Sequence, residues 1–319
     1  MRDKIHFGAV GRDLYLDLPL TNVVMDYRPE GMIADMIAPI VDVPKQSGAI
    51  IEWSQADLLR VEDDTRAPGT AAKRITVGVS SQTYFANNYA LQAGVTLEDR
   101  FNADPAYASK MFEGRATRLK DKLMLNWENR IGTQVFSASN VGSSAAVTSI
   151  WTGAGADPLA DLNVAIDNVY YATGYRPNRA LFGPKAWSAF RRHSTVRNLI
   201  FGTNNGGGYP SAQRVADLLE LDSVLVGAAL KNNTEENIAK SLVPIWGPSV
   251  LLYYAPAAPS IDRPSFMYSY RVSGGGVPNM QVERHPYDTK TKTDDIEVGY
   301  YQDELVTSKP LGFLVQSCA

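Results

Sequence analysis

The chain has 319 residues, of which 45% are hydrophobic and 20% are charged, so it is long enough to bury a sizeable core in two domains. Its net charge of −3 excludes the basic footprint of a dedicated nucleic-acid-binding protein. The single cysteine, Cys318, excludes a disulfide framework or a cysteine-based metal site within one subunit, and the lack of an apolar run of about 18 residues excludes a membrane span.

Residues 1–45 show little periodicity and predict an extended arm, with one or two helical turns over residues 32–37 that end before Pro39. The apolar residues of such an arm cannot form a core without other segments. We therefore expect the arm to pack against the rest of the fold or against a neighbouring subunit.

Residues 46–95 predict a long β-hairpin, because apolar and polar residues alternate at Ile75, Val77 and Val79. Between its strands, residues 60–74 hold seven charged residues and the turn signal of Pro68 and Gly69. This segment is either a solvated loop or a protruding arm whose charges meet another copy of the chain. The charged residues of its tip are Glu62, Asp63, Asp64, Arg66, Lys73 and Arg74.

Residues 104–134 predict one long helix of roughly 45 Å. Asp104 is a favourable N-cap, and Pro105 suits the first helical position. Apolar residues recur every three or four positions from Ala108 onward and form a stripe for the core, consisting of Phe112, Leu119, Leu123, Trp127 and Ile131. The other faces are assigned to the charged residues Lys110, Glu113, Arg115, Arg118, Lys120, Asp121, Lys122, Glu128 and Arg130.

The second half of the chain changes pattern twice. Amphipathic helical segments alternate with short apolar segments over residues 158–260, which predicts a small sheet with helices on its faces. Residues 261–319 predict an antiparallel meander that ends with the strand GFLVQSC. The fold class is therefore α+β.

No combination of residues supports catalysis. His6, His193 and His285 are far apart in the sequence, and neither a GxSxG motif nor a Walker A loop is present. The acidic residues near the C-terminus predict solvated faces, with a divalent-cation site as the alternative; they are Asp294, Asp295, Glu297, Asp303 and Glu304. We expect no catalytic residue, no cofactor and no bound metal, and a soluble enzyme with an unusual metal site is the remaining enzymatic alternative.

The order of these elements resembles the major capsid proteins of tailed bacteriophages, which have the Hong Kong 97-type fold. ADMIAPIVDVPKQSGAIIEW resembles the end of the family's N-terminal arm entering its extended loop, and DDTRAPGTAAKRITVGVSSQTYFANNYAL resembles the loop tip and the returning strand. VTLEDRFNADPAYASKMFEGRATRLKDKLMLNWENRI resembles the lead-in and the spine helix. YRPNRALFGPKAWSAFRRHSTVRNLI resembles a pattern of the axial domain, in which a buried strand precedes a helix that begins near Trp187.

The resemblance implies an architecture of five parts. These are an N-terminal arm (1–45), an extended β-hairpin loop (46–95), the spine helix with the first part of the peripheral domain (96–155), an axial α/β domain (156–260) and a β return to the peripheral domain (261–319). Axial domains would meet as pentamers and hexamers of an icosahedral shell. The hairpin would lie over one neighbouring subunit, and the arm would run beneath another.

The resemblance also implies partners. Double-stranded DNA would lie inside the shell, held non-specifically by basic residues that otherwise only solvate the helix, namely Lys110, Arg115, Arg118 and Lys122. The arm has no long helical scaffolding pattern, so we expect a separate scaffolding protein, together with a portal and in some cases a decoration protein. Assembly would occur in the host bacterial cytoplasm, and the product would be the virion.

An encapsulin-like nanocompartment shell that holds a protein cargo is the alternative with the same fold. Those shells typically start with a helix, so the predicted extended arm argues against this alternative.

Overall fold

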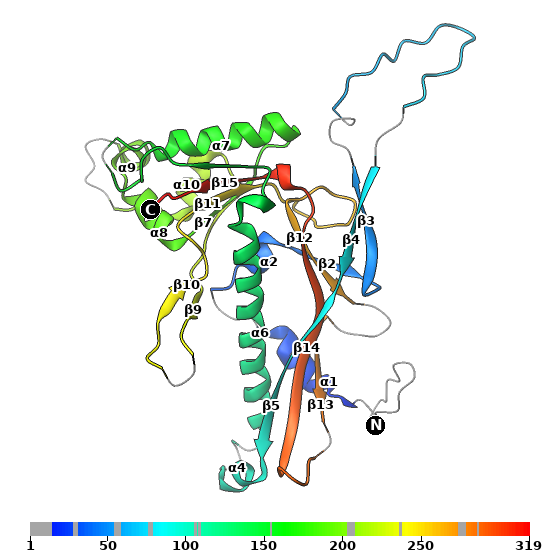
Figure 1. Cartoon of the computed structure of the whole chain (residues 1–319), viewed down its shortest axis with the longest axis vertical. Helices are drawn as coiled ribbons and strands as arrows, with labels where there is room; N and C mark the ends of the chain where they lie inside the picture. Colours follow the sequence, from blue (N-terminus) through cyan, green and yellow to red (C-terminus); the bar gives the residue numbers. More distant parts are fainter. Residues whose placement is uncertain are drawn as a thin grey trace.

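The computed structural model describes residues 15–27, 31–53, 59–75, 79–104, 107, 110–153, 155–202, 208–235, 238–273, 279–285 and 287–319. His6, Val77, Pro105 and Ala108, on which predictions above rest, lie outside these ranges. The described residues form an α/β part and a second β part joined by one long helix, and a hairpin projects beyond both (Figure 1). Within these ranges, no helix combines the length and the apolar character that crossing a membrane requires.

The α/β part is built on a five-stranded sheet with the order β6-β15-β11-β7-β8. Its strands are β6 Ser143–Ala146, β15 Gly312–Gln316, β11 Val250–Tyr253, β7 Arg179–Phe182 and β8 Ser223–Val226. Successive residues of β11 enter two different cores, with Val250 and Leu252 in one and Leu251 and Tyr253 in the other. Both faces of the sheet are therefore covered, which explains the continuous apolar runs of its central strands.

Helices supply the first of these two cores. They are α7 Pro158–Thr173, α8 Pro184–Arg192, α9 Ser194–Phe201 and α10 Ala212–Leu219. The side chain of Asp157 caps α7 by accepting hydrogen bonds from the amides of Leu159 and Ala160, and Gly174 ends the helix in the left-handed conformation with φ of 74°. A short hairpin, β9 Leu230–Asn232 with β10 Leu242–Pro244, projects from this part of the molecule (Figure 1).

Strand β15 corrects the prediction that residues 261–319 form one meander. It pairs antiparallel with β11 and parallel with β6, so it lies inside the α/β sheet. Phe313, Leu314 and Val315 are all buried, and a strand with three consecutive buried apolar residues needs a covering layer on each face. In the α/β sheet each face has such a layer, because the two cores lie on opposite faces. The short 3₁₀ turns η1 Ala138–Asn140 and η2 Lys309–Leu311 lie just before β6 and β15.

The second part is a six-stranded peripheral sheet. Its order is β1-β13-β14-β12-β2, and β5 also pairs with β14. The strands are β1 Tyr15–Leu16, β13 Gln281–Arg284, β14 Thr293–Val306, β12 Met267–Val272, β2 Ile40–Val43 and β5 Asn87–Thr96. The 14-residue strand β14 pairs with three others, which makes it the centre of this sheet. All pairs in this sheet are antiparallel except β12 with β2.

The predicted hairpin over residues 46–95 is shorter than expected. Strands β3 Ser47–Trp53 and β4 Val79–Phe85 pair antiparallel, but the chain then leaves the hairpin at the buried Ala86 and continues as β5 in the peripheral sheet. The hairpin is anchored at its base, where the ring of Tyr84 stacks on that of Tyr270 with 5.3 Å between centroids. Residues 87–96 therefore belong to the peripheral sheet.

The long helix α6 runs from Met111 to Val135, and its buried side faces a core that includes residues of both sheets. It begins later than predicted. A separate short helix, α4 Leu97–Asn102, precedes it, and the amides of Tyr107 and Lys110 bond to carbonyls three residues earlier in the chain. Bonds of this spacing form tight turns rather than α-helix. We refer to α6 as the spine helix.

Candidate assembly site

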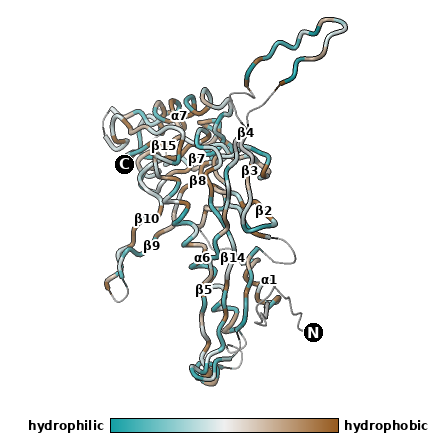
Figure 2. The backbone as a smooth tube through the Cα atoms, turned by 45° about the vertical axis from the view of Figure 1, so that its right-hand side comes forward, coloured by the Kyte–Doolittle hydropathy of each residue, from teal (hydrophilic) through white to brown (hydrophobic). Residues whose placement is uncertain are grey.

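Residues 59–75 form the part of the hairpin that projects furthest from the molecule (Figure 1), and we refer to them as the projecting loop. The predicted tip residues all lie on it; Glu62 is partly exposed, and Asp63, Asp64, Arg66, Lys73 and Arg74 are exposed. The apolar side chain of Val61 is 97% exposed. Figure 2 shows residues of mixed hydropathy along the loop, which extends away from the rest of the chain. It therefore offers both charged and apolar side chains for a contact outside the chain.

Contacts within the loop join the described residues of its tip. The Nζ atom of Lys73 lies 2.6 Å from the carboxylate of Glu62, and the Nε atom of Arg66 donates to the carbonyl of Thr70 over 2.6 Å. Hydrogen bonds from Thr65 to Asp63 lower the pKa of that exposed carboxyl. Exposed ion pairs contribute at most about 1 kcal/mol, so these contacts leave the loop free to adapt to a partner surface.

The spine helix buries the predicted apolar stripe. Leu119, Leu123, Trp127 and Ile131 are buried, and Phe112 is half-buried beneath the guanidinium of Arg284. Gly132 lies on the same side, where a Cβ atom would come within 2.9 Å of Ile245. The absence of a side chain at this position permits close packing of the spine helix against the α/β part.

Lys120 and Glu128 were assigned to solvated faces of this helix, and that prediction is wrong. Their side chains are 7% and 0% exposed. Both belong to a row of residues spaced four apart with Ala116, Met124 and Gly132, all of which are buried. That spacing is the sequence signal that identifies them, because a charged residue within a buried row needs a partner.

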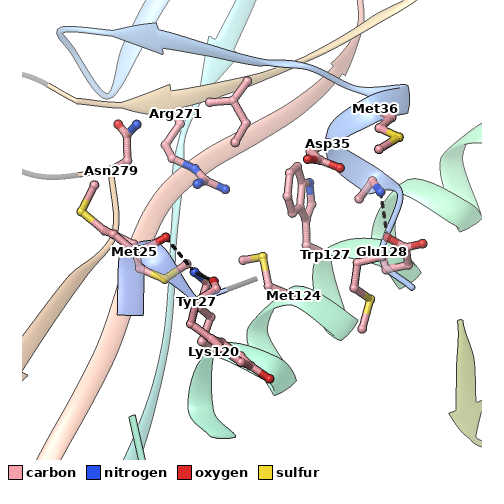
Figure 3. A pocket seen from close by; sticks show the side chains of 14 residues that line it. Met25, Tyr27, Asp35, Met36, Lys120, Met124, Trp127, Glu128, Arg271 and Asn279 are labelled. Carbon is pink, nitrogen blue, oxygen red and sulfur yellow. Dashed lines mark hydrogen bonds between the residues drawn. The ribbon is translucent and has the colours of Figure 1, made fainter. Parts of the chain in front are cut away.

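Their partners are main-chain groups of the N-terminal arm (Figure 3). The carboxylate of Glu128 accepts hydrogen bonds from the amides of Ile33 at 3.1 Å and Ala34 at 2.8 Å, and from the indole Nε1 of Trp246 at 2.9 Å. The ammonium of Lys120 donates to the carbonyls of Val24 and Tyr27. Sequence patterns do not reveal such pairs, because the partners are backbone atoms about 95 residues away.

The arm itself differs from its prediction in one helix. Helix α1 covers Leu18–Asp26 where an extended chain was expected, whereas the expected short turn is present as α2 Ala34–Ile37. The side chain of Asp17 caps α1 by accepting from the amide of Leu20, and Pro19 suits its first turn. Both helices pack on the spine helix of the same chain. The buried residues of both helices are therefore covered within one chain.

The four basic residues considered for DNA contact lie at the start and on the solvent side of the spine helix. Lys110, Arg118 and Lys122 are exposed, and Arg115 is partly exposed with its guanidinium 3.9 Å from the carboxylate of Asp99. No other ion pair of these four residues is present among the described residues. They form a basic strip that is open to solvent in one subunit.

The acidic residues near the C-terminus are used within the chain. Glu304 is buried, and its carboxylate accepts three hydrogen bonds from Arg130, the shortest at 2.7 Å. Asp294 pairs with Arg100 and Arg284, and Glu297 lies 3.0 Å from the Nε2 atom of His285. The expectation of a solvated face is therefore wrong for Glu304, which joins the spine helix to β14.

The carboxyl of Glu128 predicts a pH dependence of stability. Its burial raises its pKa to about 7, although the hydrogen bonds from Ile33, Ala34 and Trp246 act in the opposite direction. Between pH 4.5 and 7 the folded chain retains a proton that the unfolded chain loses, so the free energy of unfolding should fall by a few kcal/mol at most across this window and then level off.

Urea unfolding at pH 5, 6, 7 and 8 would test this dependence, with Glu128→Gln as the matched control. We expect the difference in free energy between the two proteins to change from pH 5 to 7 and to stay constant above pH 7.5. Equal pH slopes for both proteins would contradict the assignment.

Comparisons of the sequence with known proteins find similarity to phage major capsid proteins. A family model described as Phage major capsid protein E matches residues 137–222, which comprise most of the α/β part. The chain is 26% identical over 313 residues to the Major capsid protein of Pseudomonas phage JBD67, and the alignment covers 95% of this chain and 96% of that one.

The chain is also similar in fold to solved structures. The structure of a phage-related protein from Bordetella bronchiseptica RB50 matches with a TM-score of 0.72 at 21% identity, over 95% of this chain and 97% of that one. The SrpI encapsulin of Synechococcus elongatus PCC 7942 matches less well, with a TM-score of 0.53 at 13% identity, over 94% of this chain and 95% of that one.

These matches establish that the chain has the Hong Kong 97-type α+β fold, so the predicted fold class is confirmed. Among proteins of this fold, it is similar over nearly its whole length to a phage major capsid protein, which confirms the predicted resemblance.

Proposed function

We propose that the chain is the major capsid protein of a tailed double-stranded DNA bacteriophage, which self-assembles through pentamers and hexamers into an icosahedral shell around the genome. The observation that carries the proposal is its similarity to a phage major capsid protein over 95% of the chain. Phage major capsid proteins are structural, so we propose no enzymatic activity and no cofactor for this chain.

The projecting loop is the element that this role explains best. Val61 and Ile75 are 97% and 61% exposed in the single chain, and burying them against a neighbouring subunit would favour assembly. The contact would be heterologous, because the loop of one subunit would meet a different surface of the next, and repeated contacts of that kind close around symmetry axes. Obligate interfaces of this type bury about 2,000 Å² or more.

The proposed shell also implies the remaining partners. Lys110, Arg115, Arg118 and Lys122 would face inward and attract DNA phosphates without base specificity, so the contact would weaken as salt is raised. We further propose a separate scaffolding protein, a portal and an optional decoration protein. The shell would assemble in the host bacterial cytoplasm and would be part of the virion.

An encapsulin-like shell with a protein cargo is the second candidate, and the match to an encapsulin structure favours considering it. The argument that the arm lacks a helix no longer excludes it, because α1 is present. The lower TM-score, 0.53 against 0.72, and the similarity in sequence to a phage protein favour the capsid.

Electron microscopy of the purified full-length protein in negative stain, with sedimentation in parallel, tests self-assembly. We expect closed shells, tubes, or rings of five or six subunits. A monodisperse monomer or dimer that persists when salt and protein concentration are raised would contradict assembly without the scaffolding protein. The contents of native particles then separate the two candidates: nuclease-protected double-stranded DNA supports the capsid, and a protein cargo in fixed proportion supports the encapsulin.

A further inference from the structure

The spine helix holds the N-terminal arm at two points with charges of opposite sign. Lys120 binds the end of α1 and Glu128 binds the start of the segment that contains α2. The two residues are eight positions apart, which corresponds to about 12 Å along a helix axis. A cation suits carbonyls at the C-terminal end of a helix, so the Lys120 contact is charge-assisted, and the Glu128 contact is charge-assisted when its carboxyl is ionised.

The two arm helices bury few apolar side chains of their own. Helix α1 buries Leu20, Thr21 and Val24, whereas Leu18 and Met25 remain 47% and 44% exposed. Helix α2 has four residues, of which two are buried. Polar contacts therefore contribute to the attachment of the arm. Besides the bonds of Lys120 and Glu128, the carbonyl of Met36 accepts from Arg179 and Tyr253, and the Oγ1 atom of Thr21 accepts from the amide of Val282.

The surface beneath the arm is adaptable. A pocket of about 330 Å³ lies between the arm, the spine helix and the peripheral sheet (Figure 3). Its lining includes five methionines, which are Met25, Met32, Met36, Met124 and Met280. Methionine side chains are flexible and accommodate changes in packing, so the arm rests on a surface that tolerates its movement.

We propose that Lys120 and Glu128 form a two-point clasp, and that α1 and α2 are a strap that opens as one unit while the two sheets and the spine helix remain folded. Because Glu128 also accepts a hydrogen bond from Trp246, the clasp links the strap to the α/β part of the molecule. Opening would uncover Met124 and Trp127 on the spine helix. The inference is independent of the proposed capsid function, because it concerns contacts within one chain.

Hydrogen exchange followed by mass spectrometry on the full-length protein tests the clasp. The variants are Glu128→Leu, which removes both acceptor oxygens, and Lys120→Met, which keeps the apolar stem. The matched controls are Glu113→Leu and Lys122→Met, because both residues are exposed on the same helix. Every protein is compared in the same oligomeric fraction.

We expect either clasp variant to accelerate exchange in both α1 and α2 by about tenfold or more, because each variant leaves buried main-chain groups of the arm without their hydrogen-bond partner. Peptides from β11 and β14 should keep their protection, and both controls should match the wild type. Unchanged arm exchange would show that there is no clasp. Acceleration of only the helix next to the altered charge would disprove opening as one unit, and equal acceleration in β11 and β14 would show that both charges are ordinary core contacts.

Discussion

Deletion of residues 63–73 should leave a soluble, folded subunit that no longer forms stable shells. The contacts that the structure shows at the tip, between Glu62 and Lys73 and between Arg66 and Thr70, lie within the loop and are exposed. Losing them should therefore change the free energy of unfolding of the subunit by no more than about 1 kcal/mol. Assembly should fail because every subunit of the shell would lose its contact with a neighbour.

Sedimentation and electron microscopy measure the assembly defect, and circular dichroism with a thermal melt measures the fold. A useful control replaces residues 63–73 with a glycine-serine segment of the same length, which keeps the reach of the hairpin and removes the side chains. Shells of normal yield and stability from the deletion variant would contradict the role assigned to the projecting loop. A deletion variant that is unfolded would contradict the view that the tip is independent of the core.

Substitution of Trp127 by alanine should lower the free energy of unfolding by about 3–5 kcal/mol. The side chain is 4% exposed, and the guanidinium of Arg271 lies 5.3 Å from its ring centroid. The ring also lines the pocket beneath the arm, so its removal would enlarge an existing space that the surrounding side chains fill only in part.

Urea unfolding followed by circular dichroism measures this loss. Asn126→Ala is the matched control, because the neighbouring residue on the same turn is exposed, and its effect should stay within about 0.5 kcal/mol. An unchanged unfolding midpoint for Trp127→Ala would show that the spine helix does not depend on this residue for its packing.

Features that depend on neighbours in the sequence were accessible to prediction. The spacing of Leu119, Leu123, Trp127 and Ile131 was sufficient to identify the buried side of the spine helix, and the charged segment with Pro68 and Gly69 was sufficient to identify a turn between two strands. Helix α1 was equally accessible to prediction, because Asp17 and Pro19 form a standard helix start.

The pairing of strands that are far apart in the sequence was not accessible to prediction. The apolar strand β15 fits a meander or a covered sheet equally well from its residues, and its place beside β11 became clear only from the register of Val315 with Val250. In the same way, β5 continues the alternation of the hairpin strand before it, yet it pairs with β14 rather than with the hairpin.

The buried charged residues show most clearly which features cannot be predicted from the sequence. Residue type and spacing predicted an α+β chain with a long amphipathic helix and a charged projection. The burial of Lys120 depends on the carbonyl of Tyr27, and the burial of Glu128 depends on the amide of Ala34. Every residue type has a main-chain carbonyl, and every type except proline has an amide N–H. Because these partners carry no side-chain signature, their position is set by the packing of the arm on the spine helix and is visible only once the chain has folded.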